Sequence, residues 1–167
     1  MSIVVEDGTG VTSAVAYSTA TELRAYVPHG GLAVPATATD SQLEAALVRG
    51  TAYIEAVYAS RWPGVRENEG QGLAWPRSDA WDFDGYVISG VPQAVKNACM
   101  EAALIEANEA SALTEALERG GMVIRKKTGP LEKEYAPAAP VCTVYPVIKQ
   151  CLASIIRFGG GVKFTRG

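Results

Sequence analysis

The segment QGLAWPR at residues 71–77 decides how the chain is expected to fold. It follows a helical pattern of apolar residues, and it places a leucine and a tryptophan inside an otherwise polar loop. The proline after the tryptophan fixes a backbone dihedral and removes a hydrogen-bond donor. No catalytic chemistry requires these residue types, whereas a large aromatic side chain in such a setting is usually buried. We therefore predict a structural anchor that tethers the loop to the preceding helix, formed by Trp62, Leu73, Trp75, Pro76 and Arg77.

Apolar residues at helical spacing extend from this segment in both directions. Capping-box patterns at Thr19-x-x-Glu22 and Ser41-x-x-Glu44 predict two helix starts, and Pro92 and Pro146 suit the first turns of two more. The predicted helices cover residues 19–27, 41–60, 92–110 and 146–158. The expected fold is mainly α: a small helical bundle of about four helices, with extended N- and C-terminal arms. We expect one domain over residues 1–158 and a flexible tail over 159–167.

Two interruptions in the helical pattern carry distinct predictions. Residues 63–90 are too aromatic to be disordered, so we expect a long loop folded over the helices. At about 122–135, two charged strands flank Thr128-Gly129-Pro130, which predicts an inserted β-hairpin. A two-stranded ribbon is marginal alone, so it needs the domain body or a neighbouring subunit to lean on. If the hairpin leans on a neighbouring subunit, the residues assigned to that contact are Arg125, Lys126, Lys127, Lys133 and Tyr135. The alternatives are a solvated ribbon and direct DNA binding.

Composition excludes several classes of function. A formal charge of −3 and a pI near 5.2 argue against a protein whose main task is to grip phosphate backbones. The sequence shows no run long enough to cross a bilayer and no signal peptide, so we expect synthesis in the cytosol and no membrane partner. The three cysteines lack metal-site spacing and the chain has one histidine, so no structural metal is expected.

The search for catalytic chemistry is also negative. The sequence contains no phosphate-binding glycine motif before a helix. His29 precedes two glycines and is expected to be an exposed residue at a helix end, not a catalytic base. Asp79, Asp82 and Asp84 alternate in the long loop, but solvated carboxylates are favoured over a cation site. We expect no enzymatic activity, no catalytic residues and no cofactor.

Four motifs in this order resemble a known family. They are residues 4–10 (VVEDGTG), 44–55, 71–77 (QGLAWPR) and 128–135 (TGPLEKEY). Together they are similar to the connector adaptors, or head-completion proteins, of tailed phages, which often carry the name DnaT-like single-stranded-DNA-binding protein. The resemblance runs from about residue 3 to about 156. It implies a virion structural protein that forms a ring between the portal and the next neck or tail protein. The implied ring is dodecameric in the virion, and packaged double-stranded DNA passes through it without sequence-specific binding.

The resemblance also implies a role for the C-terminus. Adaptors of this kind dock on the portal largely through their last segment, and here a glycine joint at 159–161 precedes a short basic tail. The residues expected to bind the portal are Ile155, Ile156, Phe158, Val162, Lys163, Phe164 and Arg166. The implied locations are the virion neck and, during assembly, the host cytoplasm. The alternatives are a replication accessory protein that binds single-stranded DNA, and a monomeric regulatory domain.

Overall fold

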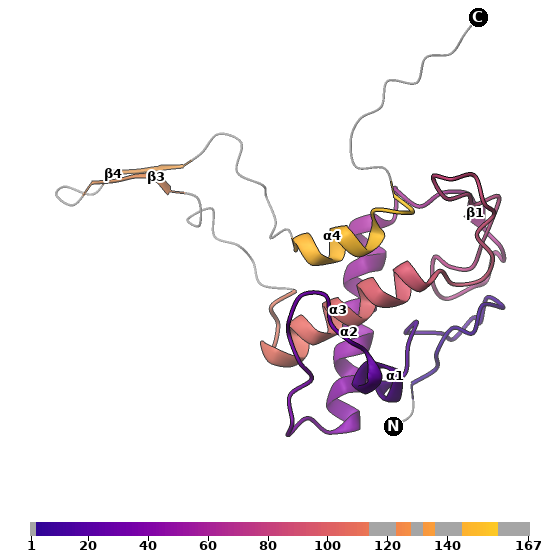
Figure 1. Ribbon diagram of the computed structural model, residues 1–167, viewed down its shortest axis with the longest axis horizontal. Helices are drawn as coiled ribbons and strands as arrows, with labels where there is room; N and C mark the ends of the chain where they lie inside the picture. The colour runs from indigo at the N-terminus through magenta and orange to yellow at the C-terminus, as the bar shows by residue number, and fades with distance from the viewer. Residues whose placement is uncertain (1–2, 114–122, 128–131, 136–144, 157–167) are drawn as a thin grey trace, which may run out of the picture.

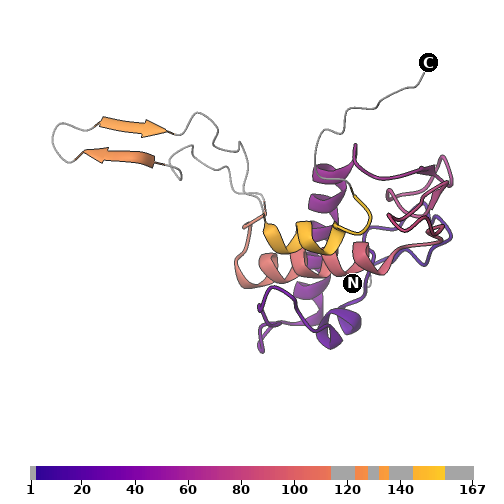
Figure 2. The same cartoon turned by 45° about the horizontal axis from the view of Figure 1, so that its top comes forward.

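Two crossing helices form the centre of the molecule. The computed structural model describes residues 3–113, 123–127, 132–135 and 145–156, with side chains for 3–113 and 145–156. The helices in these residues are α1 (Ala20–Ala25), α2 (Asp40–Tyr58), α3 (Gln93–Asn108) and α4 (Pro146–Leu152). In both views of the ribbon, α4 lies alongside α3 and both cross α2 (Figure 1 and Figure 2). The prediction of a mainly helical bundle is confirmed.

A glycine makes the close crossing of α2 and α3 possible. A Cβ atom at Gly50 would lie 2.8 Å from the backbone nitrogen of Ala103 and 3.0 Å from the carbonyl oxygen of Cys99. Only a residue without a side chain allows the two backbones to approach in this way. The buried residues then divide into two clusters, one shared by α2, α3, α4 and the 71–80 segment, the other by α1, α2 and α3.

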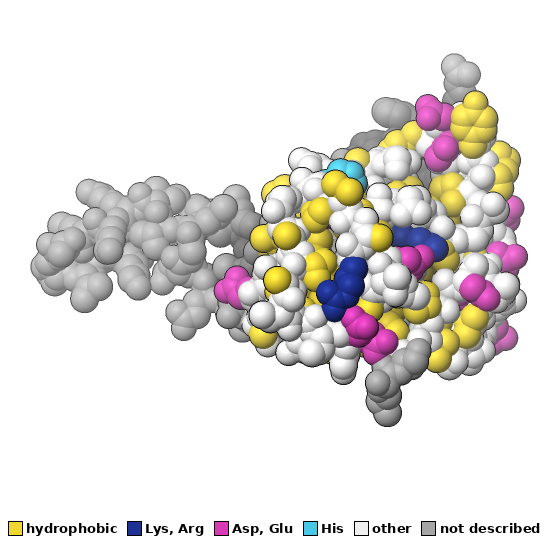
Figure 3. All heavy atoms as spheres, turned by 60° about the horizontal axis from the view of Figure 1, so that its bottom comes forward, with side chains coloured by type: hydrophobic (Ala, Val, Ile, Leu, Met, Phe, Trp, Pro, Cys, Tyr) yellow, Lys and Arg dark blue, Asp and Glu magenta, His cyan; other side chains and the backbone are white. Residues whose placement is uncertain are grey.

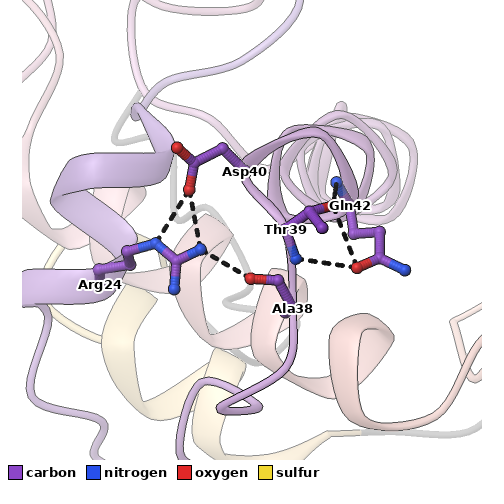
Figure 4. Close-up of polar contacts among 5 residues, drawn as sticks. All are labelled: Arg24, Ala38, Thr39, Asp40 and Gln42. Atoms are coloured by element: carbon purple, nitrogen blue, oxygen red, sulfur yellow. Dashed lines mark hydrogen bonds and ion pairs between the residues drawn. The ribbon is translucent and has the colours of Figure 1, made fainter.

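The start of α2 differs from the prediction. Thr39, not Ser41, is the N-cap: its hydroxyl accepts a hydrogen bond from the Gln42 backbone, and the Gln42 side chain accepts one from the Thr39 backbone. Arg24 pairs with Asp40, 2.8 Å away, and also donates to the carbonyl of Ala38 (Figure 4). These contacts from α1 hold the segment just before the helix, so the helix begins there. The capping box predicted at Thr19 and Glu22 is confirmed.

Two short antiparallel sheets accompany the helices in the described residues. They consist of β1 (Val65–Arg66) with β2 (Arg77–Ser78), and β3 (Val123–Lys127) with β4 (Glu132–Tyr135). The β3–β4 pair confirms the predicted hairpin to within one residue at each end. The β1–β2 pair was not predicted. It joins the two sides of the long loop beside Trp75, so this part of the loop is ordered, as expected.

The last helix is shorter than predicted. α4 ends at Leu152, and a turn in which Ile155 and Ile156 donate to the carbonyl of Leu152 completes the described chain. Both isoleucines are buried against the core, which holds this turn in place. Residues 157 and 158 and the predicted tail lie outside the described residues. No helix in the described part of the chain is long and apolar enough to cross a membrane.

Candidate interaction surfaces

The segment 71–77 is anchored by both packing and hydrogen bonds. Trp75 is fully buried, and its ring meets that of Trp62 edge to face, with centroids 5.9 Å apart. The Gln71 side chain donates to the carbonyls of Leu73 and Pro76. The peptide bond between Trp75 and Pro76 is cis. Leu73, Pro76 and Trp62 are buried as well. These four residues are thus buried, and their role as an anchor for the loop stays a prediction.

Arg77 closes the anchor through the backbone of the loop. Its guanidinium donates to the carbonyls of Pro63, Gly64 and Ala74, at 2.6, 2.7 and 3.3 Å. Partial burial lowers the pKa of Arg77, and the nearby Arg66 charge lowers it further. The guanidinium therefore acts as a structural cross-link between loop segments, and its donors are directed toward the protein's own carbonyls.

A half-buried carboxylate, which the sequence analysis did not identify, holds the other side of the anchor. Glu55 on α2 accepts hydrogen bonds from the Tyr17 hydroxyl at 2.6 Å and the Ala74 backbone at 2.8 Å. The Tyr17 hydroxyl in turn accepts from the Trp75 backbone at 3.0 Å. Burial raises the pKa of the Glu55 carboxyl, and burial together with the Glu55 charge raises that of Tyr17. Glu55 borders a groove of about 560 Å³ between α2 and the loop, but both of its oxygens already accept hydrogen bonds within the chain.

Other buried carboxylates are also structural. Glu6 is 1% exposed and accepts hydrogen bonds from three backbone amides in residues 8–11. Glu101 is fully buried and accepts from the Tyr26 hydroxyl and the backbone of His29 and Gly30. By accepting from several backbone amides at once, each carboxylate holds a turn of the chain in place. Within the described residues, no group of three His, Cys, Asp or Glu side chains could hold a metal ion.

Charge is unevenly divided along the chain. The body, defined here as residues 3–113 and 145–156, holds 14 of the 18 acidic residues and 7 of the 15 basic ones, a formal charge of −7. The rest of the chain holds the other 8 basic residues and 4 glutamates, a formal charge of +4. On the face in Figure 3, acidic side chains are spread widely and basic ones are few. The body therefore offers phosphate groups an unfavourable surface.

Several arginines of the body are also engaged internally. Arg24 pairs with Asp40, and Arg49 lies 2.6 Å from the buried carboxylate of Glu106. Arg77 donates to loop carbonyls, as described above. Cations held by their own chain have fewer donors to offer a nucleic acid, so the geometry of the body does not form a basic groove.

The tip of the long loop displays aromatic side chains. Trp81, Phe83 and Tyr86 are 52%, 50% and 72% exposed. The backbone there is ordered: Trp81 bridges Val87, and the Asp82 carboxylate accepts from the amides of residues 84 and 86. Asp79, Asp82 and Asp84 stand among the aromatic residues. We call residues 79–87 the acidic aromatic loop. Exposed apolar area on an ordered tip is typical of an interaction surface.

The β3–β4 hairpin is a second candidate surface. The pairing of its strands shows which residues lie opposite one another. Arg125 is opposite Glu134 and Lys127 is opposite Glu132, whereas Lys126 is opposite Lys133. Figure 1 and Figure 2 draw these strands to one side of the helical body. The hairpin thus brings together the residues assigned to a subunit contact, including Tyr135 opposite Val123. Their contact with a neighbour stays a prediction.

The residues assigned to portal binding fall in two places. Ile155 and Ile156 are 5% and 1% exposed, packed in the core with α4. Their burial assigns them a packing role, and a partner would have to displace this last turn to reach them. Phe158, Val162, Lys163, Phe164 and Arg166 lie outside the described residues. Portal binding by any of them stays a prediction.

Comparison with known proteins identifies one family. No curated protein and no solved structure matches the chain. A family profile described as "Putative DnaT-like ssDNA binding protein" matches residues 1–167, the whole chain. The chain therefore belongs to the DnaT-like single-stranded-DNA-binding protein family.

Proposed function

We propose that the chain is a structural subunit of a tailed-phage connector. It assembles as an adaptor ring between the portal and the neck or tail, with packaged DNA passing through the ring. The observation that carries this proposal is the division of charge along the chain, between the acidic body, at −7, and the remaining residues, at +4. A ring of acidic bodies repels the phosphate backbone, so a duplex can pass without being held, and the proposal gives the basic residues outside the body to protein contacts.

The polar interior of the body supports the same proposal. Two of its carboxylates hold loops: the buried Glu6 accepts hydrogen bonds from three amides, and the half-buried Glu55 accepts from Tyr17 and Ala74. Such a body suits a preformed building block, whose surfaces are fixed before assembly. A role in assembly needs no reactive group, which agrees with the expectation of no enzymatic activity.

Electron microscopy of the protein with its cognate portal tests the proposal. Negative-stain images should show an extra ring of density that is attached to the portal and coaxial with it. A monomer in isolation is compatible with the proposal, because ring formation can require the portal as a template. If the two purified proteins stay separate at all concentrations tested, the connector function is wrong.

The family's description favours a second candidate, a single-stranded-DNA-binding protein. The feature of this chain that suits it is the hairpin, with Arg125, Lys126, Lys127 and Lys133 on two short strands. On this hypothesis an oligothymidine should bind tightly at about 50 mM salt and far more weakly at about 200 mM, because neutralised phosphates release counterions. Weak binding with a shallow salt slope would favour the connector instead.

A further inference from the structure

We propose that copies of this chain associate by docking the β3–β4 hairpin of one copy on the acidic aromatic loop of another. The inference concerns contact between copies. It rests on the ring of the proposed function, because both require copies to associate; failure of the connector function would show separately, as absence of binding to the portal.

The hairpin register places two positively charged residues opposite each other. Residues directly opposite one another on paired strands share a face, and successive residues alternate between faces. Arg125 with Glu134, and Lys127 with Glu132, are complementary pairs. Lys126 opposite Lys133 sets two like charges together, which destabilises an isolated ribbon. An acidic surface brought against this face would remove that repulsion.

The acidic aromatic loop has the chemistry to receive that face. Its carboxylates supply the opposite charge, and its half-exposed aromatic rings supply apolar area beside them. The loop is also preorganised, because Asp82 holds the amides of residues 84 and 86 at 3.0 and 2.8 Å. Little conformational entropy remains to be lost when a partner binds an ordered loop.

Charge decides between a second copy and a nucleic acid as the occupant of the loop. Exposed aromatic rings could stack with bases, but stacking platforms for single strands lie among cations, which guide the phosphates. Here the charged residues among the rings are all acidic: Asp79, Asp82 and Asp84. Phosphates would be repelled, whereas a lysine pair from another copy would be attracted.

The experiment uses sedimentation equilibrium of the full chain and two single charge reversals, Lys133→Glu and Asp84→Lys. Asp84 is exposed, and no contact of its carboxylate is part of the loop's structure as described, so reversal there leaves the fold intact. Each reversal should weaken self-association by about tenfold or more, since each opposes two like charges. The double variant should recover most of the wild-type association. Raised salt should weaken the wild-type contact.

Glu109→Lys is the matched control. It changes the net charge by the same amount as Asp84→Lys. Glu109 is exposed and lies just beyond the C-terminal end of α3, whereas the acidic aromatic loop precedes the N-terminal end of that helix. It should leave association unchanged. A wild type that is monomeric throughout, single variants that associate normally, or a double variant no better than the singles would each overturn the proposal. So would a Lys133→Glu variant that associates normally but loses oligothymidine binding, which would make the hairpin a nucleic-acid element.

Discussion

Tyr17 and Glu55, 38 positions apart in the chain, are joined by a hydrogen bond of 2.6 Å. The tyrosine is fully buried, and its hydroxyl also accepts the backbone amide of Trp75. One hydroxyl thus connects the N-terminal segment, α2 and the anchored loop. Because the three elements meet at this group, its removal should affect the whole domain.

Replacing Tyr17 with phenylalanine should destabilise the fold by about 1–3 kcal/mol, since it removes a hydrogen bond to the half-buried Glu55 and leaves the buried Trp75 amide without its partner. Chemical denaturation of the two proteins measures the difference. Tyr86→Phe, at a residue that is 72% exposed, is the matched control and should change stability little. Equal stability of Tyr17→Phe and wild type would show that water replaces the hydroxyl.

Trp75→Ala should cost about 3–5 kcal/mol, as for other buried aromatic truncations, because Trp75 is fully buried against Trp62. The melting temperature should fall clearly. Trp81→Ala removes the same ring from a half-exposed site, and its effect should stay within about 0.5 kcal/mol. If both variants melt alike, the loop anchor does not stabilise the domain.

Stability should depend on pH through Glu55. Burial raises the pKa of this carboxyl above its ordinary value of 4.5, so the folded state retains a proton that the unfolded state loses. The contribution of the protonated Glu55 to the unfolding free energy is fully present at a pH below its ordinary pKa. It is lost as the pH rises through the pKa of Glu55 in the folded state. The unfolding free energy of wild type relative to Glu55→Gln should therefore fall as the pH rises from about 4. A difference that grows over that range would contradict the direction; Glu69→Gln, on an exposed loop, serves as the control.

The elements that could be predicted from sequence are those set by local pattern. Helical spacing located α2 and α3, and the turn residues with their charged flanks located the hairpin. Trp75 was expected to be buried because a large aromatic side chain beside the end of an apolar helix pattern is usually buried. In each case the signal lies within about 20 neighbouring residues, which is where propensity and periodicity act.

The features that were missed depend on distant residues. Two capping patterns begin two positions apart, at Thr39 and Ser41; the first one forms, and Arg24 from α1 contacts Ala38 and Asp40 on either side of it. Glu55 occupies a helix position that is typical of a solvated carboxylate, and its partners come from residues 17 and 74. An acidic residue in a helix is a weak signal of burial, so the sequence alone could not reveal its partner.

Gly50→Ala should destabilise the domain, although alanine favours helices by about 1 kcal/mol over glycine. Its Cβ would meet the Ala103 backbone at 2.8 Å, so α2 and α3 would have to separate. Overpacking of this kind costs about 1–3 kcal/mol before that helical gain. Denaturant titration should show a net loss, and Ala52→Gly on the exposed face of α2 should cost only about 0.5–1 kcal/mol. A stabilised Gly50→Ala would mean that the helices adjust freely.

Truncation after Phe158 should separate folding from attachment to a portal. The truncated chain retains Ile155 and Ile156, which are buried in the core, so helical circular dichroism and melting should match wild type. It lacks Lys163, Phe164 and Arg166, which the resemblance to connector adaptors assigns to portal binding. Buried aromatic and arginine side chains often carry about 2 kcal/mol or more each at interfaces, so Phe164→Ala alone should weaken attachment by about tenfold or more. Pull-down with portal rings measures this, with Thr165→Ala as the neighbouring control; capture of the truncated protein at wild-type levels would refute a portal-binding tail.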